Sequence, residues 1–235
     1  MVMFDFTDVN TPEYISFAKF VDIKTNVPFK ITEVDPLVIP YGFKTEVGPF
    51  RSYKQEDIIS KDECDYLIWL AESKDEWLEE TISFWAGRNL PFLTMLPTRP
   101  FASPETMGIC VDIVKRIQKF INESFGCDAW PDQIGLVRWP PNSFQMTHKD
   151  DVEGLERVAG CVVFLNDDYE GGEPFYPYYN KMVKPKAGMV YAHSSDEDHL
   201  HGVTQIKNKI RYTISSTWTT NKSKCPYLGQ LEGQR

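Results

Sequence analysis

Two segments in the first half of the chain carry apolar residues at the spacing of an amphipathic helix. Residues 60–74 open with Ser60 and Glu63, which have the separation of a capping box, in which each side chain satisfies the other residue's free backbone N–H. Residues 104–125 open with a proline, follow a serine that can act as N-cap, and end before a glycine. The apolar stripe of this second segment consists of Met107, Cys110, Val111, Val114, Ile117, Ile121 and Phe125. We therefore predict two helices that cover one face of a sheet.

Beyond about residue 133 the apolar residues occur in short runs that have the length of strands. The runs include "QIGLVRW", "VAGCVVFLN", "GMVYAHS" and "RYTISSTW", and turn residues such as "PPN" and "KPKAG" separate them. Several short strands at this spacing are typical of a β-sandwich or jelly roll and not of a parallel sheet. The predicted fold class is α+β, with the helices ahead of the strands.

The pattern divides the chain into three parts. Residues 1–55 combine prolines, aromatic residues and short apolar alternations, and we predict an N-terminal arm with short strands. Residues 56–221 form the predicted main domain, and residues 222–235 a C-terminal tail. Within the domain, residues 81–101 mix aromatic residues with glycine, arginine and prolines, so they are either a substrate-facing lid or buried packing.

Composition and charge exclude several classes of function. Hydrophobic residues make up 42% of the 235 residues, enough for a substantial core. The formal charge of −9 and the lack of a basic stripe argue against nucleic acid as a partner. The chain starts without a signal-peptide pattern, and no stretch approaches the roughly 18 apolar residues that would span a membrane. Five cysteines without a CxxC pair indicate reduced thiols, so we expect a cytoplasmic protein; its oligomeric state is left open.

The stretch "MTHKDD", residues 146–151, places a histidine two positions before an aspartate. On a strand the side chains of residues i and i+2 point to the same side, so His148 and Asp150 can reach one ion, while Asp151 points away. Three downstream histidines are alternatives for a third ligand: His193, His199 and His201. Two imidazoles and one carboxylate on one octahedral face leave three positions open, as in the facial triad of non-haem Fe(II) oxygenases.

A longer pattern extends this pair. His148 and Asp150 form a histidine-x-aspartate motif, which is followed after about fifty residues by His201. Arg211 comes ten residues after His201. The stretches "VVFLNDDYEGGEPFYP" and "VKPKAGMVYAHSS" lie between the two halves of this pattern. In these features the sequence resembles the Fe(II)- and 2-oxoglutarate-dependent dioxygenases, specifically their prolyl 4-hydroxylase-like branch. The resemblance is strong over residues 133–218 and loose over 57–126, and it implies a double-stranded β-helix (jelly-roll) core with N-terminal helices packed on the major sheet.

The resemblance also chooses among the histidines. His199 is the rival of His201, but Gly-Val follows His201 as in the family, and the step of ten residues to Arg211 fits only His201. His193 precedes a polar, acidic loop and is expected to be a structural histidine at the surface or in a loop.

The resemblance implies an enzyme with Fe(II) held by His148, Asp150 and His201. It further implies 2-oxoglutarate and O2 as cosubstrates, with ascorbate as an optional reductant. Arg211 would bind the far carboxylate of 2-oxoglutarate through paired hydrogen bonds, and the hydroxyl of Thr213 is a candidate second donor. The implied reaction hydroxylates a C–H bond and converts 2-oxoglutarate to succinate and CO2.

Three departures from the branch concern the substrate. Gln145 and Trp139 stand where the branch usually has tyrosines, and Phe164 replaces a tyrosine that hydrogen-bonds the cosubstrate in some relatives. Trp139 is expected to wall the pocket, by packing or by touching the cosubstrate. The first hypothesis is a hydroxylase of a peptidyl or protein residue, proline first. The alternatives are a hydroxylase of a free amino acid or other small metabolite and a non-catalytic jelly-roll interaction module.

Overall fold

The computed structural model describes residues 46–73, 78–79, 88–91 and 103–233. Most of the predicted N-terminal arm and most of the segment 81–101, with its predicted role as a lid, lie outside these described residues.

Both segments with helical spacing form helices, and the sequence signals at their ends explain where they begin and end. Helix α2 (Lys61–Glu72) starts with the predicted capping box between Ser60 and Glu63. Helix α3 (Pro104–Phe125) has Ser103 as its N-cap. It ends at Gly126, whose φ of 66° lies in the left-handed region that costs glycine little.

The strands form two antiparallel sheets. The larger sheet has the order β1-β9-β6-β11-β4-β3-β2, and the smaller has the order β5-β10-β7-β8. The strands are β1 (Ser52–Gln55), β2 (Leu78–Glu79), β3 (Arg88–Pro91), β4 (Trp130–Trp139), β5 (Gln145–His148), β6 (Arg157–Phe164), β7 (Pro174–Tyr176), β8 (Lys181–Met182), β9 (Val190–Ser194), β10 (His201–Val203) and β11 (Arg211–Thr219). Neighbours within each sheet run in opposite directions, in agreement with the predicted jelly roll and not with a parallel sheet.

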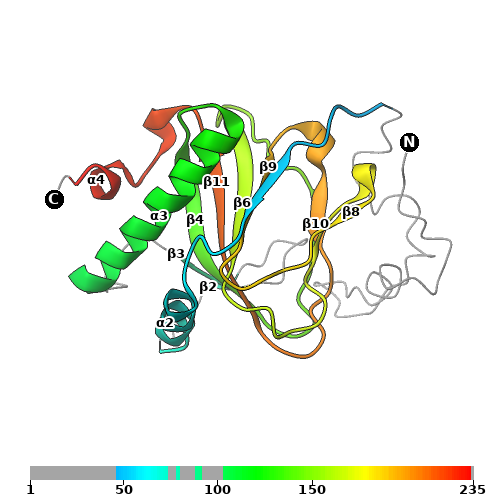
Figure 1. Ribbon diagram of the computed structural model, residues 1–235. Coiled ribbons are helices and arrows are strands. Elements are labelled where there is room, and N and C mark those ends of the chain that lie inside the picture. The colour runs from blue at the N-terminus through cyan, green and yellow to red at the C-terminus, as the bar shows by residue number, and fades with distance from the viewer. Residues whose placement is uncertain (1–45, 74–77, 80–87, 92–102, 234–235) are drawn as a thin grey trace.

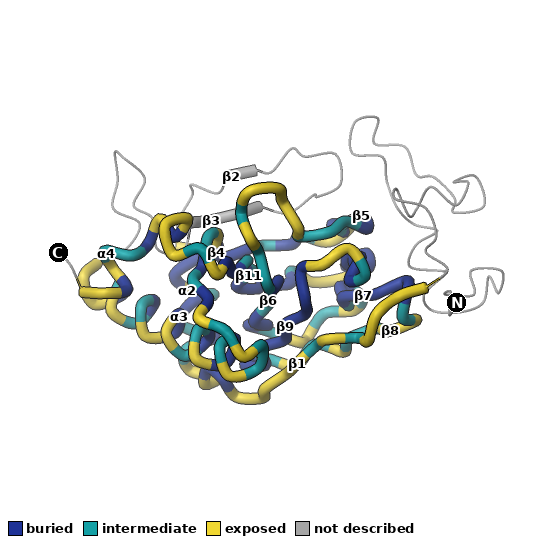
Figure 2. The backbone as a smooth tube through the Cα atoms, turned by 90° about the horizontal axis from the view of Figure 1, so that it is seen from above, coloured by how far each residue is buried: buried dark blue, intermediate teal, exposed yellow. Residues whose placement is uncertain are grey.

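Helices and sheets are arranged in layers. In Figure 1, α2 and α3 lie on one side of the larger sheet, and β8 and β10 lie on the other. Apolar side chains of both helices share one buried cluster with side chains of β4, β6, β9 and β11. Figure 2 shows the central strands largely buried and the outward sides of the helices exposed.

The predicted C-terminal tail is folded onto this core. Residues after β11 include a short helix, α4 (Leu228–Leu231). Tyr227 and Leu231 belong to the same buried cluster as the helices and the larger sheet. All five cysteines lie within the described residues and are free thiols. Among the described helices, none is long and apolar enough to cross a membrane.

Candidate metal centre

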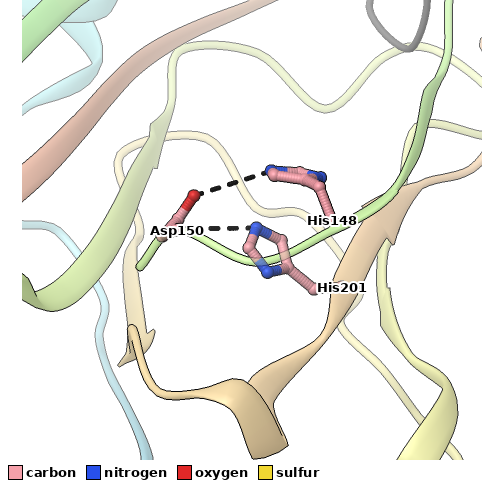
Figure 3. Close-up of side chains that lie close together, drawn as sticks. All are labelled: His148, Asp150 and His201. Carbon is pink, nitrogen blue, oxygen red and sulfur yellow. Dashed lines mark ion pairs between the residues drawn. The ribbon is translucent and has the colours of Figure 1, made fainter. Parts of the chain in front are cut away.

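Three of the predicted site residues meet at the edge of the smaller sheet. His148 ends β5, and the antiparallel pairing with β10 places His201 directly opposite. Asp150 follows His148 by two residues, as the motif requires. One ligand atom from each of the three residues lies within 4.8 Å of the others. Figure 3 shows the two imidazoles turned toward the carboxylate, with Nε2 of His148 3.6 Å from Oδ1 and Nε2 of His201 3.8 Å from Oδ2.

The loop that carries Asp150 is fixed by an arginine from β6. Arg157 donates from Nη1 to the backbone carbonyl of Asp150 at 3.0 Å. The same guanidinium donates from Nε and Nη2 to Oδ2 of Asp132, at 2.9 and 2.7 Å. This ion pair is nearly buried, so Arg157 is itself held rigidly. The main chain at Asp150 is therefore anchored to the larger sheet.

A glycine of β6 leaves room for the carboxylate. A Cβ at Gly160 would lie 2.0 Å from Oδ2 of Asp150, and 2.6 and 2.7 Å from Cε1 and Nε2 of His193. Real Cβ atoms do not make contacts this short. The carboxylate and the imidazole therefore rest on the bare backbone of Gly160.

The electrostatics of the cluster favour deprotonated donors. Burial lowers the pKa of His201 well below its ordinary value, and the neighbouring His193 and His148 lower it further. Burial also lowers the pKa of His193. Burial by itself would raise the pKa of Asp150, but His201, His148 and His193 together hold it below its ordinary value. A divalent metal ion binds the deprotonated forms of histidine and aspartate, so the lowered pKa values of His201 and Asp150 favour metal binding.

The structure separates the rival histidines. His199 faces away from the centre: its Nδ1 donates to Oδ1 of Asp196 at 2.6 Å, and its Nε2 accepts the backbone N–H of Arg51 at 2.9 Å. His199 is therefore structural, as expected. The prediction for His193 is wrong in its location, because this residue is buried on β9 and its Nε2 lies 3.7 Å from Oδ2 of Asp150. The sequence placed it before an acidic loop, but the pairing of His193 with Gly160 turns its ring into the site.

Arg211 lies in the interior, with 1% of its surface exposed. Its guanidinium carbon is 5.1 Å from the ring centre of Trp139 and 5.5 Å from that of Phe164. Its Nε and Nη1 have no hydrogen-bond partner among the described residues. Burial lowers the pKa of Arg211, while Tyr169 and Glu173 raise it. A buried guanidinium with unpaired N–H groups is the arrangement expected for a site that binds an anion.

Trp139 and Thr213 are neighbours on adjacent strands. The indole Nε1 of Trp139 donates to Oγ1 of Thr213 at 3.2 Å, and both side chains are buried. Trp139 stacks on Arg211 and lines the cavity, so it does wall the pocket. The binding of cosubstrate by Thr213 stays a prediction.

One cavity of about 310 Å³ connects these features. Its walls come from both sheets, and its lining includes His148, Asp150, His201, Trp139 and Arg211. The candidate metal ligands and the buried guanidinium therefore open into the same space.

Sequence reasoning missed three further residues of the site. Gly160 and Arg157, both on β6, position Asp150, and Tyr176 stacks on the ring of His201 at a centroid distance of 5.7 Å. Tyr176 stands in the "GGEPFYP" stretch, which carried the resemblance but gave no sign of which side chain faces the centre. Glycine and arginine occur on many strands that contribute nothing to a binding site, and only the pairing of strands showed their role.

The sequence matches no protein-family model, and it matches no functionally curated protein. Solved structures are similar to it. A viral collagen prolyl hydroxylase from Paramecium bursaria Chlorella virus-1, in a 2OG complex, matches with a TM-score of 0.56 and 20% identity, over 73% of this chain and 97% of that chain. A prolyl-4-hydroxylase from Pseudomonas putida matches with a TM-score of 0.56 and 16% identity, over 72% of this chain and 92% of that chain. A Trichoplax adhaerens prolyl hydroxylase, in complex with a peptide fragment of a hypoxia inducible factor, matches with a TM-score of 0.55 and 14% identity. This match covers 79% of this chain and 87% of that chain. The predicted resemblance is confirmed at the level of the fold: the chain has the fold of the prolyl hydroxylases.

Proposed function

We propose that this chain is an Fe(II)- and 2-oxoglutarate-dependent dioxygenase that hydroxylates a C–H bond of a peptidyl or protein residue, with proline as the first candidate. The observation that carries the proposal is the single cavity that contains both His148, Asp150 and His201 and the buried Arg211. A zinc hydrolase could use the same three ligands, but it has no use for a buried arginine in the same cavity. An interaction module would need neither.

The donor set suits Fe(II). Two imidazoles and one carboxylate are the ligands of the facial triad, which leaves three positions for small molecules. Each imidazole of a metal site is normally fixed by a hydrogen bond from its other ring nitrogen. His201 has this bond, since its Nδ1 donates to the carbonyl of His199 at 3.0 Å. When bound, the iron would supply the oxidising chemistry that no side chain can supply.

The residues of the chain would bind, orient and shield. Arg211 would hold the far carboxylate of 2-oxoglutarate, because it lines the cavity and its Nε and Nη1 have no hydrogen-bond partner in the part of the chain that the structure describes. The rings of Trp139 and Phe164 would keep the guanidinium in place. The reaction would consume 2-oxoglutarate, O2 and a C–H bond, and it would produce succinate, CO2 and a C–OH group.

The structural neighbours support the proposal of a peptide substrate. Three of them are prolyl hydroxylases by name, and one of these is bound to a peptide. The departures at Gln145 and Phe164 change side chains around the centre and leave the three metal ligands and Arg211 in place. We therefore propose a peptidyl substrate first, and a free amino acid or other small metabolite as the alternative outcome of the test.

The test is aerobic incubation with Fe(II), 2-oxoglutarate and libraries of proline-containing peptides and of free amino acids. We expect succinate to form only when iron and 2-oxoglutarate are both present, together with a product heavier by one oxygen atom. His201→Gln should abolish succinate formation. His199→Gln is the matched control, because His199 lies two residues away and faces out of the cavity.

Two outcomes would contradict the proposal. One is succinate formation that survives His201→Gln. The other is a folded protein that binds Fe(II) but shows no 2-oxoglutarate turnover with any substrate library and no binding of 2-oxoglutarate in calorimetry. Oxygen incorporated into free amino acids and not into peptides would replace the peptidyl substrate by the metabolite.

A further inference from the structure

A tyrosine in the loop between β6 and β7 lies beside the guanidinium of Arg211. The phenol oxygen of Tyr169 is buried and has no hydrogen-bond partner among the described residues, and the same is true of Nε and Nη1 of Arg211. Gly172 shows how closely the two side chains approach, because a Cβ there would lie 2.8 Å from Cδ of Arg211 and 3.0 Å from Cε2 of Tyr169. Three buried polar atoms without a partner in the described part of the chain thus belong to two adjacent side chains.

Hydrogen bonds before Tyr169 in the sequence fix this loop to the strand that carries Arg211. Asn166 donates from Nδ2 to the backbone carbonyl of Ile210 at 2.8 Å. Its Oδ1 accepts the backbone N–H of Tyr212, also at 2.8 Å. Ile210 and Tyr212 are the two neighbours of Arg211 in the sequence, so the start of the loop is held directly at the arginine.

The loop is fixed after Tyr169 as well. The backbone N–H of Glu170 donates to Oδ1 of Asn208 at 2.9 Å, and its carbonyl accepts the backbone N–H of Lys207 at 2.9 Å. The next residue, Gly171, lies so close to the same segment that a Cβ there would be 1.9 Å from the carbonyl oxygen of Gln205. The main chain on both sides of Tyr169 is therefore set by the protein and needs no ligand to hold it.

The hydroxyl of Tyr169 is a hydrogen-bond donor at neutral pH. Burial raises the pKa of Tyr169 above its ordinary value of 10, and the charge of Arg211 opposes this rise only in part. The two aromatic residues over which the guanidinium lies do not supply such a donor. Phe164 has no polar side-chain atom, and the indole N–H of Trp139 donates to Oγ1 of Thr213.

A carboxylate would satisfy the phenol and the guanidinium together. A guanidinium carries only donors, and a carboxylate accepts several hydrogen bonds at once, so it can take two N–H groups and one O–H. Burial lowers the pKa of Arg211, whereas Tyr169 and the carboxylate of Glu173 raise it. Glu173 thus offsets part of the positive charge of Arg211. A neutral donor would strengthen the binding of a second carboxylate without adding another charge.

We propose that the hydroxyl of Tyr169 is a second donor to the carboxylate that Arg211 binds, and that it selects cosubstrates that end in a carboxylate; this rests on the proposed function. Arg211 lines the same cavity as the candidate metal ligands, so the guanidinium forms part of the wall of the space that 2-oxoglutarate would occupy. Tyr169 is then a specificity-determining residue. It favours 2-oxoglutarate over 2-oxo acids that lack the far carboxylate.

The test uses the full chain loaded with Co(II), a substitute for Fe(II) that air does not oxidise, and measures ligand binding by calorimetry. The ligands are 2-oxoglutarate and 2-oxopentanoate, in which a methyl group replaces the far carboxylate. We expect Tyr169→Phe to weaken the binding of 2-oxoglutarate by about 10- to 100-fold, the effect of losing a hydrogen bond to a charged group. The same variant should bind 2-oxopentanoate as the unchanged protein does.

Tyr179→Phe is the matched control. The phenol oxygen of Tyr179 is also buried without a partner among the described residues, but its ring packs against Phe50 and His199. This variant should keep the affinity of the unchanged protein for both ligands.

Equal affinities of Tyr169→Phe and the unchanged protein for 2-oxoglutarate would overturn this inference and leave the proposed function standing. A loss of the same size for 2-oxopentanoate would also overturn it, because the hydroxyl would then act through the fold and not through the far carboxylate. If the unchanged protein does not bind 2-oxoglutarate, the proposed function fails and this inference fails with it. If Tyr169→Phe does not fold, Tyr169→Met, which also lacks the donor, decides by the same comparison.

Discussion

Gly160→Ala tests whether the bare backbone of β6 sets the position of the Asp150 carboxylate. The added Cβ would lie 2.0 Å from Oδ2, whereas ordinary contacts begin at 3.4 Å, so the oxygen has to move by about 1.4 Å. The main chain at Asp150 cannot retreat easily, because Arg157 holds its carbonyl at 3.0 Å. The added Cβ would also lie 2.6 Å from Cε1 of His193, whose Nε2 is 3.7 Å from the same carboxylate oxygen. The carboxylate must therefore leave its present position beside the two imidazoles of the centre.

Two measurable losses follow. Overpacking of a buried site costs about 1–3 kcal/mol, so we expect the free energy of unfolding in urea to fall by that amount. Moving a metal ligand or the residues that orient it weakens metal binding by about 10- to 100-fold, and we expect a loss in this range for Co(II). Without the clash the free energy of unfolding should rise and not fall, because replacing glycine by alanine within a strand stabilises a protein by about 0.5–1 kcal/mol.

Gly108→Ala is the matched control. Gly108 is exposed on α3, and a Cβ there would meet nothing within 4 Å. This variant should gain up to about 1 kcal/mol of stability and bind Co(II) as the unchanged protein does. A Gly160→Ala protein that is as stable as the unchanged protein and binds Co(II) equally well would refute the reasoning, since the carboxylate would then not depend on the gap.

Three further predictions concern the guanidinium and the helix ends. Arg211→Met should leave the ligand-free protein as stable as before, or more stable by about 1–4 kcal/mol, because it removes a buried charge whose Nε and Nη1 lack a partner among the described residues. The same variant should abolish the rise in melting temperature caused by 2-oxoglutarate, and a retained rise would contradict the role of Arg211. Glu63→Gln should cost about 1 kcal/mol near pH 7 in urea unfolding, because Glu63 pairs with Arg116. Burial alone would raise the pKa of Glu63, but Arg116 and Ser60 hold it below its ordinary value of 4.5. The difference in unfolding free energy between the unchanged protein and Glu63→Gln should therefore shrink as the pH falls through that lowered pKa. A difference that stays constant with pH would refute this prediction. Gly126→Ala should cost about 1–2 kcal/mol through backbone strain alone, since its φ is +66° and the space is open; an unchanged midpoint of unfolding would argue against this.

The ends of the helices and the pair of His148 and Asp150 were determined by the sequence alone, because they depend on residues only a few positions apart. The capping box at Ser60 and Glu63 and the left-handed glycine at Gly126 are local signals that involve only neighbouring backbone groups. Residues two apart can share one side of an extended chain, so the sequence offered His148 and Asp150 as a candidate pair. The structure ends β5 at His148 and places Asp150 in the loop that follows. The resemblance to a family then supplied His201 and Arg211, because the order and spacing of the motif carry information that composition does not.

Tertiary structure alone decided what lies around this pair. Histidines at three downstream positions were candidates in the sequence, and the pairing of strands turned His201 and His193 inward. His199 lies in a 3-10 helix (Glu197–His199), where Asp196 and the backbone of Arg51 hold its ring away from the centre. A shift of one residue in that pairing would reverse every side chain of the strand, and short-range spacing cannot fix the register between strands far apart in the chain. For the same reason no local pattern showed that the gap at Gly160 lies beneath Asp150.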